Sequence, residues 1–220
     1  MTEASIIGIH RHRIATDGEG VTTLVGFWGC PLRCKYCLNP QSWQTKDSQS
    51  KSITPEQLFN NVSIDQLYFL ATGGGITFGG GEPLLHPDFI NEFRDLCGDD
   101  WNITIETSLN VPLENLQKVY QSINNYIVDI KDTNDEIYKK YTGKSNSQAL
   151  ENLSWLIQEV GQECILVRTP LIPKYNTPED VEKSVKLLQE KGLTRFNRFT
   201  YITSGLDKKM NYYQEKARND

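Results

Sequence analysis

Two patterns of apolar residues alternate along this chain. Short runs rich in β-branched and aromatic residues are separated by longer stretches in which apolar residues recur at helical spacing. The short runs predict β-strands at 22–28, 75–79, 102–107, 126–131, 163–171 and 196–202. The longer stretches predict helices near 55–62, 86–97, 112–123, 147–160 and 178–191. Two of these helices follow a capping threonine and a proline, at Thr54-Pro55 and Thr177-Pro178.

The alternation of strands and helices predicts an α/β fold in which helical crossovers join the strands of a parallel sheet. About six such units predict a partial (β/α)6 barrel, TIM-like but not closed. Functional residues of such barrels gather at the carboxyl ends of the strands, and the segments "GC", "GGGE", "ET", "DIK" and "RTP" occur there. We expect one domain over residues 1–220, with a core at about 6–203 and a polar tail at 204–220.

The charge of the chain excludes some classes of protein. The net charge of −5 argues against a general binder of nucleic acid or of anionic membranes, which needs a basic face. No apolar run approaches the ~20 residues of a membrane-spanning helix, and the first residues lack the pattern of a signal peptide. We therefore expect a cytoplasmic protein with neither a nucleic acid nor a membrane as partner. We also expect a monomer.

Three of the five cysteines stand together in "GCPLRCKYCLNP", residues 29–40, with the spacing C-x3-C-x2-C. A structural zinc site needs a fourth ligand, for which His10 and His12 are the nearest candidates. A four-iron iron–sulfur cluster takes one thiolate per iron, so three thiolates leave one iron open to another ligand. Arg33 and Lys35 would offset part of the negative charge of such a cluster.

This spacing, with Tyr36 before the last cysteine, resembles that of the radical S-adenosylmethionine (SAM) superfamily. The resemblance implies that Cys30, Cys34 and Cys37 bind a 4Fe-4S cluster whose open iron is chelated by SAM. In that family one electron from the cluster cleaves SAM and releases a 5′-deoxyadenosyl radical. By the same resemblance, Tyr36 and Asn39 are expected to bind the cofactor.

A glycine-rich segment, "TGGGITFGGGEPLL" (72–85), follows the cysteine loop in the sequence. Glycine permits close approach of the backbone to a ligand, although a tight turn also uses such residues. Gly80-Gly81-Glu82 is similar to the Gly-Gly-Glu segment of the radical SAM superfamily. There the backbone and the carboxylate hold the amino group of SAM.

Four further stretches resemble the activating enzymes of glycyl-radical proteins, of the pyruvate formate-lyase activating type. They are "DGEGV" (17–21), "CLNPQSW" (37–43), "VDIKDTNDEIYKKYTGKSNSQALENL" (128–153) and "VRTPLIPKYN" (167–176). The chain departs from that group at Glu19, where proline is usual, and at Leu38, where histidine is usual. The last strand, "FTYITSG", also differs, although it keeps Tyr201.

The resemblance assigns charged residues to the site as well. Glu106 and Asp129, with Thr107 beside them, could hold a monovalent cation (Na⁺ or K⁺) next to the SAM carboxylate, since hard oxygen ligands suit such an ion. Lys131 and Arg168 are expected near the SAM carboxylate and ribose. The alternative for these residues is an ordinary ring of ion pairs at the mouth of the barrel.

Other reactive residue types are expected to be structural. Cys97 lies in a helical pattern and Cys164 in a strand, which predicts inert core thiols. His86 precedes Pro87 and is interpreted as the start of a helix.

The resemblance implies a radical SAM oxidoreductase that takes a hydrogen atom from a glycine of a partner glycyl-radical enzyme. A flavodoxin or ferredoxin is expected to supply the electron, because the chain has no flavin or nicotinamide motif. One alternative is a radical SAM enzyme that acts on a peptide or a small metabolite. A second is a non-catalytic iron–sulfur or zinc protein, although an electron carrier would be expected to supply four cysteines.

Overall fold

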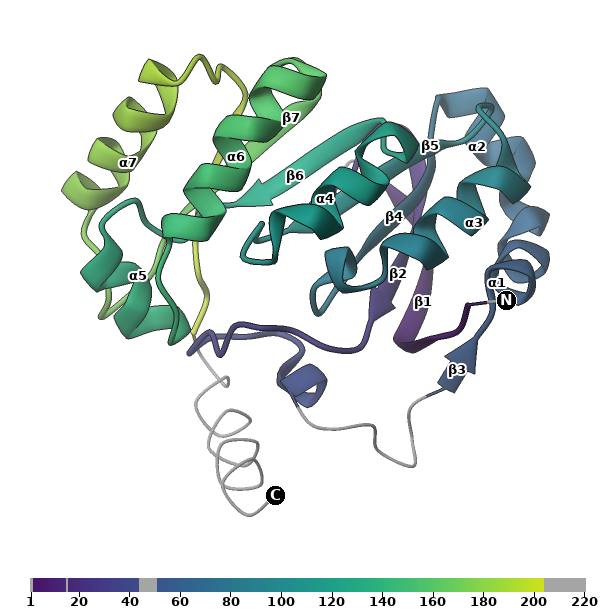
Figure 1. Cartoon of the computed structure of the whole chain (residues 1–220), viewed down its shortest axis with the longest axis horizontal. Coiled ribbons are helices and arrows are strands. Elements are labelled where there is room, and N and C mark those ends of the chain that lie inside the picture. Colours follow the sequence, from purple (N-terminus) through teal and green to yellow (C-terminus); the bar gives the residue numbers. More distant parts are fainter. Residues whose placement is uncertain (1, 15, 44–50, 204–220) are drawn as a thin grey trace.

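The computed structural model describes residues 2–14, 16–43 and 51–203 (Figure 1). One eight-stranded sheet has the order β3-β1-β2-β4-β5-β6-β7-β8. Its strands are β1 (Ala4–Ile14), β2 (Val21–Phe27), β3 (Lys51–Ile53), β4 (Gly75–Gly80), β5 (Asn102–Thr107), β6 (Asn125–Asp129), β7 (Ile165–Leu171) and β8 (Phe196–Thr200). Strands β2 and β4 to β8 run parallel, and helices lie along one side of the sheet (Figure 1). The expected open, partial barrel is confirmed.

Helices follow most of the parallel strands. They are α1 (Pro55–Val62), α2 (Gln66–Thr72), α3 (Pro87–Cys97), α4 (Leu113–Val119), α5 (Asp135–Thr142), α6 (Ser147–Val160) and α7 (Pro178–Glu190). Both threonine caps form as expected, and Thr54 and Thr177 each complete a capping box. A cap of this kind stabilises a helix by about 1 kcal/mol.

The strands β1 and β3 and the helices α2 and α5 do not appear among the sequence predictions. Strand β1 is antiparallel to β2 and β3, so the sheet is mixed at this edge. Its second half, which contains "HRHRI", is largely exposed and therefore shows no apolar run. Helix α5 is short and strongly polar, and its start depends on Asn134, whose side chain accepts from the backbone N–H groups of Glu136 and Ile137.

Packing of aromatic side chains holds β2 and β4 against α3. The rings of Phe27 and Phe78 lie 5.3 Å apart, and Phe93 of α3 lies 5.5 Å from Phe78. All three side chains are fully buried, and each contributes roughly 2–3 kcal/mol of hydrophobic free energy. This core fixes the ends of β2 and β4, from which the cysteine loop and the Gly-Gly-Glu segment continue.

The strand register brings the carboxyl ends of the parallel strands to one level. Phe27 pairs with Gly80 across β2 and β4, and Asp129 pairs with Arg168 across β6 and β7. Residues at or just past these ends therefore face one common space. No helix within the described part of the chain has the length and apolar character that membrane spanning requires. The expected tail at 204–220 lies outside the described residues.

Candidate active site

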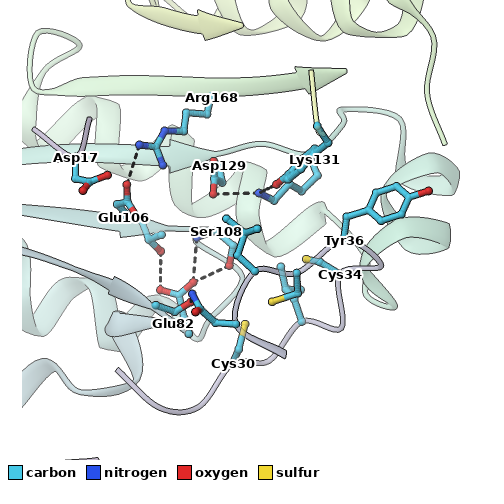
Figure 2. A pocket seen from close by; sticks show the side chains of 18 of the residues that line it. Asp17, Cys30, Cys34, Tyr36, Glu82, Glu106, Ser108, Asp129, Lys131 and Arg168 are labelled. Atoms are coloured by element: carbon cyan, nitrogen blue, oxygen red, sulfur yellow. Dashed lines mark hydrogen bonds and ion pairs between the residues drawn. The ribbon is translucent and has the colours of Figure 1, made fainter. Parts of the chain in front are cut away.

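A cavity of about 490 Å³ lies at the carboxyl ends of the strands (Figure 2). Every site residue expected from the sequence lines it. These are Cys30, Cys34, Tyr36, Cys37, Asn39, Gly80, Gly81, Glu82, Glu106, Thr107, Asp129, Lys131 and Arg168. The volume falls within the range of small-molecule sites. The tertiary structure therefore joins segments that are far apart in the sequence.

The start of the cysteine loop is fastened to the Gly-Gly-Glu segment. Gly81 N donates to Phe27 O at 2.9 Å, and Glu82 N donates to Gly29 O at 2.7 Å. A Cβ atom on Gly81 would lie only 2.0 Å from Gly29 O. Glycine at position 81 is therefore required for the close approach of two segments of the chain, and its contact with a ligand stays a prediction.

The middle of the cysteine loop is held by hydrogen bonds to the end of α5. Arg33 N donates to Thr142 O at 2.8 Å, and Lys35 N donates to Tyr141 O at 3.1 Å. Because Cys34 lies between these two anchors, its position depends on a helix that is more than 100 residues away in the sequence.

The three cysteines of the loop are partly buried. Burial is the main cause that raises the pKa of Cys30 above its ordinary value and the pKa of Cys34 to about 12. The neighbouring positive charge of Lys131 acts in the opposite direction on Cys34. Thiols in this setting become thiolates when a cation binds them, which is the behaviour of metal ligands.

The geometry does not favour a single zinc ion. Nowhere in residues 2–14, 16–43 and 51–203 do three His, Cys, Asp or Glu side chains converge closely enough for one metal ion. The candidate fourth ligand His12 is used elsewhere, because its Nε2 lies 2.9 Å from Asp65 Oδ1. A cluster that takes one thiolate per iron places its ligands farther apart than a single ion does.

Glu82 is held by hydrogen bonds in a buried position, with 1% of its surface exposed. Its carboxylate accepts from Thr107 Oγ1 at 2.7 Å, from Ser108 N at 3.0 Å and from Ser108 Oγ at 2.7 Å. Leu84 N donates to the same carboxylate at 3.2 Å. Burial raises the pKa of Glu82, and the hydrogen bonds from Ser108 and Thr107 act to lower it. Glu82 therefore joins the end of β4 to the end of β5.

On the opposite side of the cavity, the end of β6 and the residues just after it supply an ion pair between a buried lysine and a partly exposed aspartate. Lys131 Nζ lies 3.0 Å from Asp129 Oδ2 and donates to Tyr201 Oη at 3.1 Å (Figure 2). Burial acts to lower the pKa of Lys131, but the Asp129 carboxylate raises it well above the ordinary value. Asp129 Oδ1 is buried and has no hydrogen-bond partner among the described residues.

A second ion pair joins β5 to β7. Arg168 Nη2 lies 2.7 Å from Glu106 Oε1 and donates to Thr16 O at 3.1 Å. Burial raises the pKa of Glu106, although Arg168 acts to lower it. Both carboxylates of the expected cation site, Glu106 and Asp129, are therefore paired with basic side chains, and the cation stays a prediction.

Tyr36 and Asn39 have different surroundings. The ring of Tyr36 points away from Glu82 and Glu106 (Figure 2) and packs on Tyr175, with 5.8 Å between ring centroids. Asn39 Nδ2 donates to Gly80 O at 3.2 Å, which ties the cysteine loop to β4 a second time.

Several lining residues are absent from the sequence predictions. Ser108 supplies two of the donors to Glu82, and Arg13 forms an ion pair with Asp17 at the cavity. Asn197 and Phe199 of β8 also line it. The sequence offered one signal, the acidic start of "DGEGV", but the pairing of Asp17 with Arg13 depends on the β1–β2 hairpin.

Of the residues interpreted as structural, Cys97 and His86 are so placed. Cys97 packs against the hydrophobic core, and burial raises its pKa. Cys164 differs from the prediction, since it lies in the turn before β7 (Ile165–Leu171) and is only partly buried, because the strand begins one residue later. His86 is the N-cap residue of α3, and its Nε2 lies 3.1 Å from Trp28 O.

Comparison with known proteins identifies the family. The model of the "Radical SAM superfamily" matches residues 26–188, which is most of the chain and includes the cysteine loop. The chain belongs to the radical SAM superfamily. This radical SAM protein is 29% identical over 194 residues to the pyruvate formate-lyase-activating enzyme of Clostridium pasteurianum, with 87% of this chain and 80% of that enzyme covered. It is 33% identical over 181 residues to the enzyme of the same name from Listeria monocytogenes, with 79% and 71% covered.

Solved structures agree on the fold. Streptococcus suis SuiB bound to S-adenosylmethionine superposes with a TM-score of 0.60 at 17% identity, covering 87% of this radical SAM chain. The match spans 45% of SuiB, so the chain corresponds to less than half of that protein.

The residues of this radical SAM site fit the groups that the family implies, a 4Fe-4S cluster and SAM. The thiols of Cys30, Cys34 and Cys37 line the cavity beside Lys131, and burial raises the pKa of the first two, as expected for thiols that ionise only when they bind a metal cluster. Asp129 lines the same cavity, and its buried Oδ1 has no hydrogen-bond partner among the described residues, which leaves one acceptor for a bound group.

Proposed function

We propose that this chain is an activating enzyme that takes one hydrogen atom from a backbone glycine of a partner glycyl-radical enzyme. The observation that carries the proposal is the gathering of the three cysteines, Glu82 and both ion pairs around one cavity. The pyruvate formate-lyase-activating enzymes of C. pasteurianum and L. monocytogenes support it, since each is covered over more than two thirds of its length.

When bound, a reduced 4Fe-4S cluster supplies the electron that cleaves SAM to methionine and the 5′-deoxyadenosyl radical. In our proposal Cys30, Cys34 and Cys37 each bind one iron. Lys131 remains protonated and offsets the negative charge beside Cys34, with which it interacts electrostatically. The cavity positions the reacting atoms and limits the access of water.

The remaining residues orient the cofactor. Asp129 Oδ1 accepts a hydrogen bond from it, because Asp129 lines the cavity and this buried oxygen has no partner among the described residues. Arg168 presents positive charge to its carboxylate or ribose. Glu82 and Thr107 act mainly by holding the ends of β4 and β5 together, which positions the backbone of Gly80 and Gly81.

We further propose that Na⁺ or K⁺ binds between Glu106 and Asp129 when SAM is present. The free oxygen of Asp129 supports this proposal. If it holds, removal of both cations raises the KM for SAM and leaves the iron content unchanged. An unchanged KM for SAM would contradict the cation site. Glu106 and Asp129 would then serve only as partners of Arg168 and Lys131 in ion pairs.

We also propose that the enzyme works as a monomer in the cytoplasm, with neither nucleic acid nor a membrane as partner, and receives its electron from flavodoxin or ferredoxin. The net charge of −5 supports the absence of a nucleic acid or an anionic membrane as partner. The monomer is tested by sedimentation of the cluster-loaded protein, which would show a single species at the monomer mass.

The experiment that tests the main proposal is anaerobic. The protein is loaded with iron and sulfide, reduced with dithionite and mixed with SAM, and 5′-deoxyadenosine is measured by chromatography. Wild type should form the nucleoside, and Cys34→Ala should form none, because one iron ligand is lost. Iron bound by wild type without nucleoside would indicate a non-catalytic iron–sulfur protein.

The substrate is tested by adding candidate glycyl-radical enzymes and recording electron paramagnetic resonance spectra. A glycyl radical that depends on SAM supports the proposed substrate. Nucleoside formation without a glycyl radical on any candidate would favour the alternative, a peptide or small-metabolite substrate.

A further inference from the structure

The outer side of the cysteine loop carries a concentration of positive charge. Arg33 and Lys35 flank Cys34, Lys140 lies in α5 and Lys144 follows α5, and Lys174 lies in the loop after β7. We call these five side chains, Arg33, Lys35, Lys140, Lys144 and Lys174, the basic face. It stands out because the chain as a whole has a net charge of −5.

Contacts among the three segments show that the basic face is one surface. Arg33 and Lys35 form backbone hydrogen bonds with the last residues of α5, Thr142 O at 2.8 Å and Tyr141 O at 3.1 Å. Lys140 Nζ lies 5.9 Å from the ring centroid of Tyr175, the residue that follows Lys174. The cysteine loop, α5 and the loop after β7 therefore meet at this place.

The lysine charges of the basic face are available to a partner, whereas the Arg33 guanidinium also donates to Cys30 O at 2.6 Å and to Leu32 O at 2.9 Å. Among the described residues, none of its five members forms an ion pair. Neighbouring Lys139 differs, since its Nζ lies 2.6 Å from Asp135 Oδ2. Lys140, Lys144 and Lys174 are all exposed. The exposed Glu136, one helical turn before Lys140, reduces but does not cancel this local positive charge.

A thin layer of tyrosines lies between the basic face and Cys34. The rings of Tyr141 and Tyr175 lie 5.2 Å apart, and Tyr36 lies 5.8 Å from Tyr175. Cys34 packs against this same cluster. The Tyr36 ring points away from Glu82 and Glu106 (Figure 2), and it is this ring that contacts Tyr141 and Tyr175. A protein docked on the basic face would be separated from Cys34 by few side chains.

We propose that the basic face docks an acidic electron-carrier protein and that the electron enters the site past Tyr141 and Tyr175. This inference rests on the proposed function, which requires one external electron for each SAM that is cleaved. The carrier is oxidised by one electron and the group held by the cysteines is reduced by one, with no transfer of atoms. Opposite charges on the two surfaces would speed their encounter and set their orientation.

The test compares two triple variants with the same change of net charge. The first, Lys140→Glu/Lys144→Glu/Lys174→Glu, reverses the exposed lysines of the basic face. The second reverses exposed lysines toward the opposite end of the molecule, where α4 and α7 end. Its changes are Lys118→Glu, Lys186→Glu and Lys191→Glu.

Binding is measured without reference to activity. Fluorescently labelled bacterial flavodoxin is titrated anaerobically with the cluster-loaded protein at low and at high salt, and a ferredoxin is used in a second arm. The first variant should bind the acidic carrier about 10- to 100-fold more weakly than the second, and its binding should depend less on salt. Equal affinity of the two variants for both carriers would overturn the proposal.

A second measurement separates this proposal from the proposed function. With dithionite as reductant, both variants should form 5′-deoxyadenosine at the wild-type rate, because a small reductant needs no docking surface. With the reduced carrier, only the first variant should slow, by about 10- to 100-fold. If wild type forms no nucleoside with dithionite, the proposed function fails, and the titration still decides whether the basic face binds the carrier.

Discussion

The two sides of the cavity are held together by different interactions. On the β4–β5 side, Glu82 accepts hydrogen bonds from neutral donors, and the Gly81 backbone packs directly on Gly29. On the β6–β7 side, the contacts are the ion pairs Asp129–Lys131 and Glu106–Arg168. Close backbone contacts and buried hydrogen bonds tolerate little displacement, whereas partly exposed ion pairs can exchange partners. The first side therefore suits a fixed cysteine loop, and the second suits a ligand that comes and goes.

The largest effect is expected when the close backbone contact is broken. Gly81→Ala would place a methyl group 2.0 Å from Gly29 O, so that the start of the cysteine loop must move. We expect a loss of about 3 kcal/mol in the free energy of unfolding, together with reduced iron binding. Chemical denaturation and iron analysis measure the two effects. Gly73→Ala is the control, because open space surrounds Gly73 and only its positive φ of 67° opposes the change.

Loss of the Glu82 carboxylate should have the next largest effect. Glu82→Ala leaves the hydroxyl groups of Thr107 and Ser108 buried without their acceptor. We expect a loss of about 2 kcal/mol in the free energy of unfolding of the apoprotein. Ser108→Ala removes only one of these donors and should cost less. If the two variants are equally stable, Glu82 does not join β4 to β5 as described.

A smaller effect is expected on the charged side. Arg168→Leu leaves Glu106 without its partner at 2.7 Å, and we expect a loss of about 1 kcal/mol, since the side chains retain 16% and 18% exposure. Its effect on the KM for SAM should exceed its effect on stability. The double variant Arg168→Leu/Glu106→Gln should recover the stability but not the KM. Recovery of both would mean that the pair is only structural.

The stability of the charged side should depend on alkaline pH, with no effect expected near neutral pH. Burial acts to lower the pKa of Lys131, but Asp129 raises it well above its ordinary value, so the folded protein keeps a proton that the unfolded chain loses. The stability that this pair contributes is present below about pH 10.4 and is lost as the pH rises through the pKa of the folded state. The free energy of unfolding of wild type should fall up to about 1.4 kcal/mol per pH unit more steeply than that of Lys131→Met. Parallel curves would contradict the raised pKa.

Local sequence patterns were sufficient for much of the fold. The strands β2 and β4 to β8 and the helices with proline and threonine starts carry their signals within a few residues. Strand β1 and helix α5 carry no such signal. The exposed half of β1 is stabilised by pairing with β2, and α5 is short and polar, so both depend on contacts distant in the sequence.

In the site, too, some features follow from local sequence and others depend on contacts between distant segments. The cysteine spacing, the order of the motifs along the strands and the resemblance to a known family predicted many of the residues that line the cavity, because parallel strands bring their carboxyl ends to one edge. They did not predict Ser108, Arg13, Asn197 or Phe199. The partners of those residues depended on the tertiary structure. Ser108 reaches Glu82, and α5 supports Cys34, only when separate strands and loops have packed together. Residue types and strand order are local properties of the sequence, whereas hydrogen-bond partners and burial depend on where distant segments meet.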